Sequence, residues 1–189
     1  MKELLENIEN VFDDETQKIT TYIYNNKQFS SDVFDTVVSF DSNNLNLSKM
    51  RGRKGIYVFL IKEKILIEYS VVQKWNELDG AGIKSYKKTI WEIDDCLYVG
   101  ACRNKSLYSR INEHFSKEGA CTSLKLSHAN REFAKKIVKG YAFLLKRELE
   151  TYGDIVLPRI EKRLHQRLEP KAGSSRVGML LKIIGQVVY

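Results

Sequence analysis

The sequence predicts an α/β protein in which short strands and helices surround one hydrophobic core. Residues 55–61 form an apolar, aromatic and β-branched run, which is typical of a central strand. Residues 96–101 have the same character and lead directly into 107–115, where apolar side chains recur at helical spacing. With 43% hydrophobic residues among 189, the chain has enough apolar material for one packed core with an appendage.

Residues 1–50 are expected to form an N-terminal helical extension. Apolar side chains recur at helical spacing over residues 3–12, and the Asp13-Asp14 pair is suited to cap a second helix, so a helical pair is predicted. The turn-rich segment 41–48 precedes a basic run and predicts a boundary at the end of the extension. The main domain is therefore expected to span residues 51–189.

The main domain is expected to continue with strands and helices and to contain one insertion. Residues 62–95 separate the two apolar strands and form this insertion, with 64–69 as a hairpin partner of the first strand and a short helix near 71–78. Pro158 is predicted to open a last helix that extends to Leu168 and is ended by Pro170. The remaining expected elements are a helix over 129–139, a strand over 141–145, and a strand or helix over 179–189.

The charge of the chain favours a polyanionic partner without specifying one. The formal net charge is +7, and the isoelectric point is near 9.2. Residues 1–53 carry 6 Lys/Arg against 9 Asp/Glu, whereas residues 54–189 carry 25 against 15, so the basic character belongs to the main domain. Nucleic-acid binding and an ordinary solvated basic surface are equally compatible with this pattern.

The cysteines and the N-terminus indicate an intracellular protein. Cys96, Cys102 and Cys121 are odd in number, lack C-x-x-C spacing and occur without a secretory signal, so neither a disulfide framework nor a zinc ribbon is expected. Free buried thiols in a reducing cytoplasm fit this pattern better. No apolar stretch approaches the length of a bilayer span, so a soluble cytoplasmic protein without membrane partners is predicted.

Two tripeptides carry the strongest functional signal. Gly55-Ile56-Tyr57 lies in the first apolar strand, and Tyr98-Val99-Gly100 lies in the second. They are followed in order by Leu107-x-x-Arg110-x-x-x-His114, by Glu161-x-x-Leu164 and by Pro170. This succession resembles the GIY-YIG nuclease family over residues 55–173, with valine in place of the middle isoleucine of the second tripeptide. The resemblance implies a small mixed central β-sheet flanked by helices, with Gly55 and Gly100 as the motif glycines.

The resemblance also implies the chemistry of each site residue. Tyr57 would orient the attacking water and, where nearby cations favour its ionised form, deprotonate it. Tyr98 would contact the phosphate or the same water, and Arg110 would fork onto two phosphate oxygens and offset transition-state charge. Glu161 would hold Mg²⁺ or Mn²⁺ together with water and substrate oxygens. His114, one helical turn after Arg110, would accept or donate a proton near the site.

Four of these residues also have a purely structural interpretation. Tyr57 and Tyr98 are alternatively core aromatic residues, hydrogen-bonded at the ends of strands. His114 is alternatively a surface histidine or a support for the residues that touch the substrate. Glu161 is alternatively an exposed helical carboxylate paired with a neighbour on its own helix.

Two departures from the family pattern concern positive charge near the site. The insertion exceeds the usual spacing between the two tripeptides, as in restriction-enzyme members, and it either extends the hairpin or contacts nucleic acid. The lysine that often follows the second tripeptide is missing, so Arg103 or Lys105 is expected to replace its charge. The expected nucleic-acid contacts in the insertion are Lys84, Lys87 and Lys88.

A third departure concerns the end of the matched region. Gly173 stands three residues after the proline, where the family has asparagine. The hydroxyls of Ser174 and Ser175 are the expected substitutes for its hydrogen bonds. Without such a substitute, the site is expected to be weakened.

The resulting prediction is a metal-dependent endonuclease that hydrolyses DNA phosphodiester bonds in restriction, phage defence, mobile-element biology or repair. An RNA-cleaving nuclease is the alternative enzyme, because a phosphodiester site does not by itself choose the sugar. A nucleic-acid-binding module that has lost cleavage is the alternative from another class, and Gly173 is the departure that favours it. A homodimer is a further expectation, because a single site that cuts both strands needs a second protomer or a second encounter.

Overall fold

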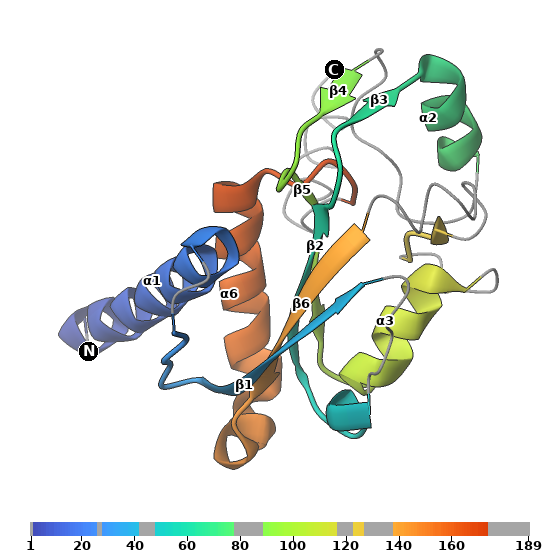
Figure 1. Cartoon of the computed structure of the whole chain (residues 1–189). Coiled ribbons are helices and arrows are strands. Elements are labelled where there is room, and N and C mark those ends of the chain that lie inside the picture. The colour runs from blue at the N-terminus through green and yellow to red at the C-terminus, as the bar shows by residue number, and fades with distance from the viewer. Residues whose placement is uncertain are drawn as a thin grey trace, which may run out of the picture.

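The computed structural model describes residues 2–25, 28–41, 48–77, 89–116, 123–126 and 138–173. A four-stranded sheet has the order β1-β6-β2-β5. Helices α1 and α6 lie on one face of this sheet and α3 lies on the other (Figure 1). The predicted class, a central sheet flanked by helices, is confirmed. The bounds of these elements are α1 (Lys2–Asn25), β1 (Phe34–Asp41), β2 (Gly55–Ile61), β5 (Cys96–Cys102), α3 (Leu107–Phe115), β6 (Val138–Leu145) and α6 (Gly153–Leu168).

Strand β2 is central because both of its faces are buried. Every residue of β2 is buried, and the strand pairs with β5 on one side and with β6 on the other. Successive side chains of a strand point to opposite faces. Tyr57 and Phe59 therefore enter the core beneath α3, whereas Ile56, Val58 and Leu60 enter the core shared with α1 and α6.

The strand directions differ in one detail from the mixed sheet that the resemblance implied. All of the pairings recorded among the described strands are antiparallel. Only a hairpin-length connection requires antiparallel pairing, and long segments separate β1, β2, β5 and β6 in the chain. The sequence therefore does not predict whether each pair of strands is parallel or antiparallel.

The predicted helical pair at the N-terminus is wrong, because α1 is one continuous helix. The Asp13-Asp14 pair, expected to cap a second helix, lies in the middle of α1. Asp14 forms an ion pair with Lys18 one turn later, at 2.8 Å, and Asp13 forms one with Arg163 of α6, at 2.7 Å. These partners stabilise the two carboxylates within the helix, so the chain does not turn there.

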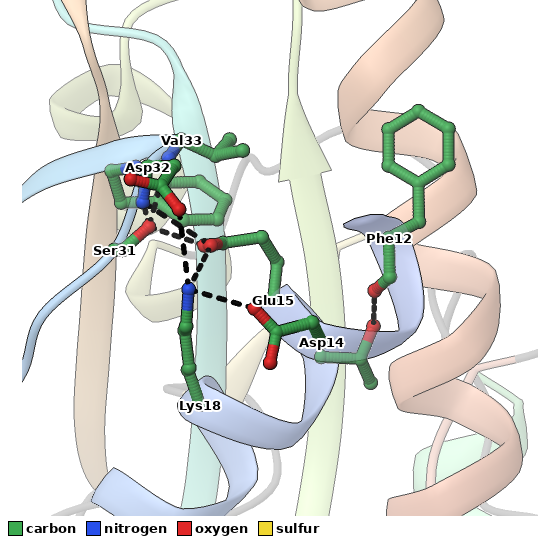
Figure 2. A network of polar contacts seen from close by, with 9 residues as sticks. Phe12, Asp14, Glu15, Lys18, Ser31, Asp32 and Val33 are labelled. Carbon is green, nitrogen blue, oxygen red and sulfur yellow. Dashed lines mark hydrogen bonds and ion pairs between the residues drawn. The ribbon is translucent and has the colours of Figure 1, made fainter. Parts of the chain in front are cut away.

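A buried carboxylate connects α1 to β1, the strand that sequence analysis did not predict (Figure 2). Glu15, 1% exposed, accepts hydrogen bonds from the Ser31 hydroxyl, from the Asp32 N–H at 3.2 Å and from Lys18 Nζ at 2.9 Å. Ser31 Oγ in turn accepts from the N–H groups at the start of β1. Residues before 50 are thus not helical throughout, since β1 belongs to the central sheet.

The insertion forms a second, two-stranded sheet. It contains β3 (Ile65–Ile67), α2 (Tyr69–Asn76) and β4 (Thr89–Trp91), and β3 pairs antiparallel with β4. The short helix near 71–78 is confirmed by α2. The prediction that 64–69 pairs with the first strand is wrong, because β5 and β6 already occupy both edges of β2. Lys84, Lys87 and Lys88 lie outside the described residues.

The C-terminal half differs from prediction mainly in element boundaries. Helix α6 follows the 3-10 segment η2 (Arg147–Tyr152) and begins at Gly153, so Pro158 lies in its second turn and does not open it. The helix lacks one backbone hydrogen bond there, because proline has no N–H. Val138 and Lys139, expected to end a helix, belong to β6; the rest of that helix and the segment 179–189 lie outside the described residues.

Two remaining expectations concern cysteines and membranes. Cys96 and Cys102 are buried thiols outside any disulfide, as predicted, and Cys121 lies outside the described residues. None of the helices in the described part of the chain has both the length and the apolar character that crossing a bilayer requires.

Candidate active site

The two motif tyrosines lie side by side on neighbouring strands. Tyr57 on β2 and Tyr98 on β5 point to the face covered by α3, and their rings stack with centroids 6.1 Å apart. Gly100 is paired with Tyr57 across the two strands, and a Cβ atom at Gly100 would overlap the Tyr57 hydroxyl. The glycine of the second tripeptide therefore provides the space that this hydroxyl occupies.

Helix α3 places its polar side chains against this tyrosine pair. The Ser106 hydroxyl caps the helix by accepting the Ser109 N–H at 3.2 Å. Leu107 and Ile111 are fully buried and fix the rotation of the helix on the sheet. Arg110 and His114, which lie beside this apolar stripe, consequently reach the Tyr57 hydroxyl.

The hydrogen bonds of His114 define its tautomer. The imidazole is fully buried, and its Nδ1 accepts the backbone N–H of Leu124 at 2.9 Å. Burial, first of all, and the charge of Arg110 hold the pKa of His114 well below 6.5, so the ring is neutral and its single proton lies on Nε2. Nε2–H then donates to Tyr57 Oη at 2.8 Å. His114 is thus a support for Tyr57, with no free lone pair to accept a proton.

Arg110 also donates to Tyr57 and is held from its other side by Glu113. Arg110 Nε–H donates to Tyr57 Oη at 3.2 Å, and Nη1–H donates to Glu113 Oε2 at 2.7 Å. The second carboxylate oxygen of Glu113 accepts from Lys105. Burial alone would raise the pKa of Glu113, but the two cations lower it on balance, so the carboxylate stays ionised. The guanidinium is therefore fixed between a phenol and a carboxylate.

The environment of Tyr57 contains opposing electrostatic effects. Burial, first of all, and the neighbouring Tyr98 raise the pKa of Tyr57 well above 10, whereas the charge and hydrogen bond of Arg110 lower it. The Tyr57 oxygen already accepts two N–H groups, so its own proton is directed to Tyr98, with which it is hydrogen-bonded. Tyr57 is 1% exposed and Tyr98 is 8% exposed, so Tyr98 is the more accessible of the two hydroxyl-bearing rings.

Glu161 approaches the same tyrosines from α6. Its negative charge contributes to raising the pKa of Tyr57 and of Tyr98, after the larger effects of burial and Arg110. One turn later on α6, His165 Nε2 bonds to the carbonyl oxygen of Val99 at 3.2 Å, which places this stripe of α6 along β5. Glu161 is half-buried and hence partly accessible to solvent.

Gly173 occupies a position where a side chain would collide with the ring of Tyr98. The segment before it runs along β5, where the Lys171 and Ala172 N–H groups donate to the Cys96 and Leu97 carbonyls, each at 2.9 Å. Gly173 itself has φ +74°, and a Cβ atom there would lie 2.8 Å from Tyr98 Cε2. The absence of a side chain therefore allows this segment to pack on the ring of Tyr98. Ser174 and Ser175 lie outside the described residues.

The other predicted site residues differ in their exposure and in their contacts. Arg103 is half-buried, whereas the Lys105 side chain is 56% exposed and is paired with Glu113. Gly55 is required by packing, because a Cβ atom there would overlap the carbonyl oxygen of Phe143. Glu113 was not predicted as a site residue, although its position three residues after Arg110 on a predicted helix was a usable signal.

No dedicated multi-ligand metal cluster is present among the described residues, since none of their His, Cys, Asp and Glu side chains form a group of three or more suited to a metal ion. Comparisons with protein-family models, with curated proteins and with solved structures found no match. The candidate site therefore rests on its own geometry: a tyrosine pair, two N–H donors on Tyr57, and a carboxylate contributed by the opposite face of the sheet.

Proposed function

We propose that the protein is a metal-dependent endonuclease that hydrolyses DNA phosphodiester bonds. One observation carries the proposal: the hydroxyl oxygen of Tyr57, a residue that is 1% exposed, accepts N–H groups from both Arg110 and His114. Two donors on a phenol oxygen stabilise its anionic form more than its neutral form. In the neutral phenol, the two N–H groups occupy both lone pairs of this oxygen. Once the phenol has released its own proton to solvent by way of the Tyr98 hydroxyl, the phenolate has a third lone pair, which is suited to orient a water molecule and to take its proton as the phosphate is attacked.

Arg110 would supply the positive charge that phosphoryl chemistry requires. Its guanidinium is partly buried, with 12% of the side chain exposed, so its charge is less screened than that of a surface arginine. Glu113 and Tyr57 hold it in one orientation. A guanidinium fixed in this way stabilises the charge that develops on the phosphate oxygens without reorganising during the reaction.

The donor set fits a hard divalent cation. Glu161 offers carboxylate oxygens, whereas neither nitrogen of His114 is available as a ligand, because Nδ1 accepts the Leu124 N–H and Nε2 bears the proton. Mg²⁺ or Mn²⁺, which are bound by one or two carboxylates and keep several waters, would suit this set. When bound at Glu161, the ion would neutralise charge on the phosphate and on the leaving oxygen.

Gly173 is the departure from the family pattern on which the binding-only alternative depends. The residue packs its bare Cα against Tyr98, so the missing asparagine has a steric explanation within the site. The two hydrogen bonds that Arg110 and His114 donate to Tyr57 favour an enzyme over this alternative. The site residues do not distinguish deoxyribose from ribose. We propose DNA as the substrate, and the first experiment tests it against RNA.

The test compares cleavage of supercoiled plasmid and of an RNA of similar length, with Mg²⁺ varied from none to excess. Glu161→Gln is the decisive variant, and Glu169→Gln is its matched control, because Glu169 is an exposed carboxylate at the end of the same helix. We expect Mg²⁺-dependent plasmid cleavage that Glu161→Gln abolishes and Glu169→Gln keeps. Preferential cleavage of RNA would overturn the proposal that DNA is the substrate. Binding of either nucleic acid without cleavage would overturn the proposal that the protein is an enzyme.

A further inference from the structure

A chain of hydrogen bonds connects the insertion to Tyr57. The indole Nε1–H of Trp75, on α2, donates to the carbonyl oxygen of Leu124 at 2.9 Å. The N–H of Leu124 donates to His114 Nδ1 at 2.9 Å, and His114 Nε2 lies 2.8 Å from Tyr57 Oη. We propose that Trp75 is a positioning residue of the nuclease site, which acts on Tyr57 through Leu124 and His114. This proposal rests on the proposed function, in which Tyr57 acts on the attacking water.

Every bond in the chain has a fixed direction. An indole N–H can only donate, and a backbone carbonyl can only accept, so the bond between Trp75 and Leu124 cannot reverse. The Leu124 N–H can only donate, so it keeps Nδ1 of His114 unprotonated and leaves the ring proton on Nε2. Trp75 thus fixes the position of Leu124. Leu124 in turn determines that the imidazole proton of His114 lies on the nitrogen next to Tyr57.

Burial makes each link costly to break. Trp75 is 2% exposed, and Leu124 and His114 are fully buried, so water does not readily replace a lost partner. Removing the indole N–H would leave the Leu124 carbonyl oxygen short of a donor inside the core, and the segment 123–126 would shift to regain one. A shift of Leu124 moves its N–H away from Nδ1, and the imidazole would then populate both tautomers.

Trp91 supplies a matched control within the same insertion. It lies on β4 and is 1% exposed, and its indole N–H has no hydrogen-bond partner among the described residues. Trp75→Phe and Trp91→Phe therefore remove the same atoms from equally buried sites, but only the first removes a hydrogen bond of this chain. A purely structural contribution of the insertion would make the two variants alike.

The first measurement is long-range ¹H–¹⁵N NMR of protein labelled at its histidines, of which the sequence has three. His114→Gln identifies the signals of His114. We expect wild type and Trp91→Phe to show one tautomer with the proton on Nε2, and Trp75→Phe to show averaged ¹⁵N shifts. Unchanged His114 signals in Trp75→Phe would overturn the proposal. If that variant does not fold, β-(3-benzothienyl)alanine at position 75 keeps the shape of the side chain without the N–H, and the same two outcomes apply.

The second measurement is a double-mutant cycle on cleavage. We expect Trp75→Phe to lower kcat about tenfold with little change in KM, and to have no further effect once His114→Gln is present, because Trp75 acts through His114. An equal loss in both backgrounds would overturn the proposal. Since the NMR signals are read without substrate, a protein that never cleaves would contradict the proposed function while the positioning by Trp75 is still decided.

Discussion

Arg110 donates its Nε–H to the hydroxyl oxygen of Tyr57 at 3.2 Å, and the same oxygen accepts the Nε2–H of His114 at 2.8 Å. These two donors oppose burial, which raises the pKa of Tyr57 well above 10. The oxygen is therefore neutral in the isolated protein, although it already has two of the hydrogen-bond donors that would stabilise its anion. A bound cation would bring its pKa down without any rearrangement of the protein.

Arg110→Lys should lower kcat for cleavage about 10²- to 10³-fold. An ammonium is a point donor and does not hold Tyr57 and Glu113 at opposite edges of a plane, and the loss of one preorganised donor to a transition state has about this effect. Arg159→Lys is the control, because Arg159 is half exposed on α6 and pairs with Glu9. Single-turnover cleavage by both variants measures the effect, and a lysine variant as fast as wild type would contradict the assignment of Arg110.

Glu113→Ala should lower kcat by about tenfold, and Glu113→Gln should restore most of the loss. The carboxylate fixes one edge of the Arg110 guanidinium, and a glutamine amide oxygen still accepts the same N–H. Lys105→Ala tests whether the effect travels through the other oxygen of Glu113, which accepts from Lys105. A loss of kcat in Lys105→Ala as large as that in Glu113→Ala would contradict this prediction, because the pairing with Arg110 would then not be the cause.

The stability of the protein should fall as the pH drops below 6.5, and His114 should be one cause. Burial depresses the pKa of His114 in the folded state, so below 6.5 the unfolded chain binds a proton that the folded chain does not. The free energy of unfolding then decreases by about 1.4 kcal/mol per pH unit from this one group, until the pH reaches the folded pKa. Urea unfolding of wild type and His114→Gln at pH 7.5 and pH 5.5 measures it; an identical pH dependence in the two proteins would exclude His114.

Gly173→Ala should destabilise the protein more than Gly52→Ala. Both glycines have positive φ, +74° and +68°, so alanine brings similar backbone strain of about 1 kcal/mol at each. A Cβ atom at Gly173 also lies 2.8 Å from the ring of Tyr98, whereas at Gly52 it meets nothing within 4 Å. The extra loss, about 1 kcal/mol or more, reports the collision with Tyr98, and equal losses would show that the ring simply moves aside.

The parts of the fold that the sequence predicted well are those with strong local patterns. The runs 55–61 and 96–101 are apolar on both faces because β2 lies at the centre of the sheet and β5 is covered by α3 and α6. The missed strand, Phe34–Asp41, has a β-branched stretch but a half-exposed burial pattern, which is typical of a strand with one solvated face. Its place in the sheet depends on pairing with β6, far along the chain, and no local pattern specifies such a pairing.

The candidate site also has features that local sequence patterns predicted and features that they did not. Tyr57, Tyr98 and Arg110 lie on elements that were predicted correctly, so their meeting followed from the order of strand, strand and helix. The tautomer of His114 depends on the backbone of Leu124, which carries no side-chain signal. The partner of β3 was predicted wrongly because pairing with β2 assumed an edge that β6 occupies, and the position of Trp75 followed only from the observed sheet.

The most direct test of the central claim is cleavage by Tyr57→Phe beside Tyr69→Phe. Each variant removes one phenol oxygen, but the Tyr57 oxygen accepts from Arg110 and His114, whereas Tyr69 is 54% exposed on the insertion. With supercoiled plasmid and Mg²⁺, we predict that Tyr57→Phe loses at least about 10²-fold in rate while Tyr69→Phe cleaves as wild type does. Full activity in Tyr57→Phe would contradict the claim that this oxygen acts on the attacking water.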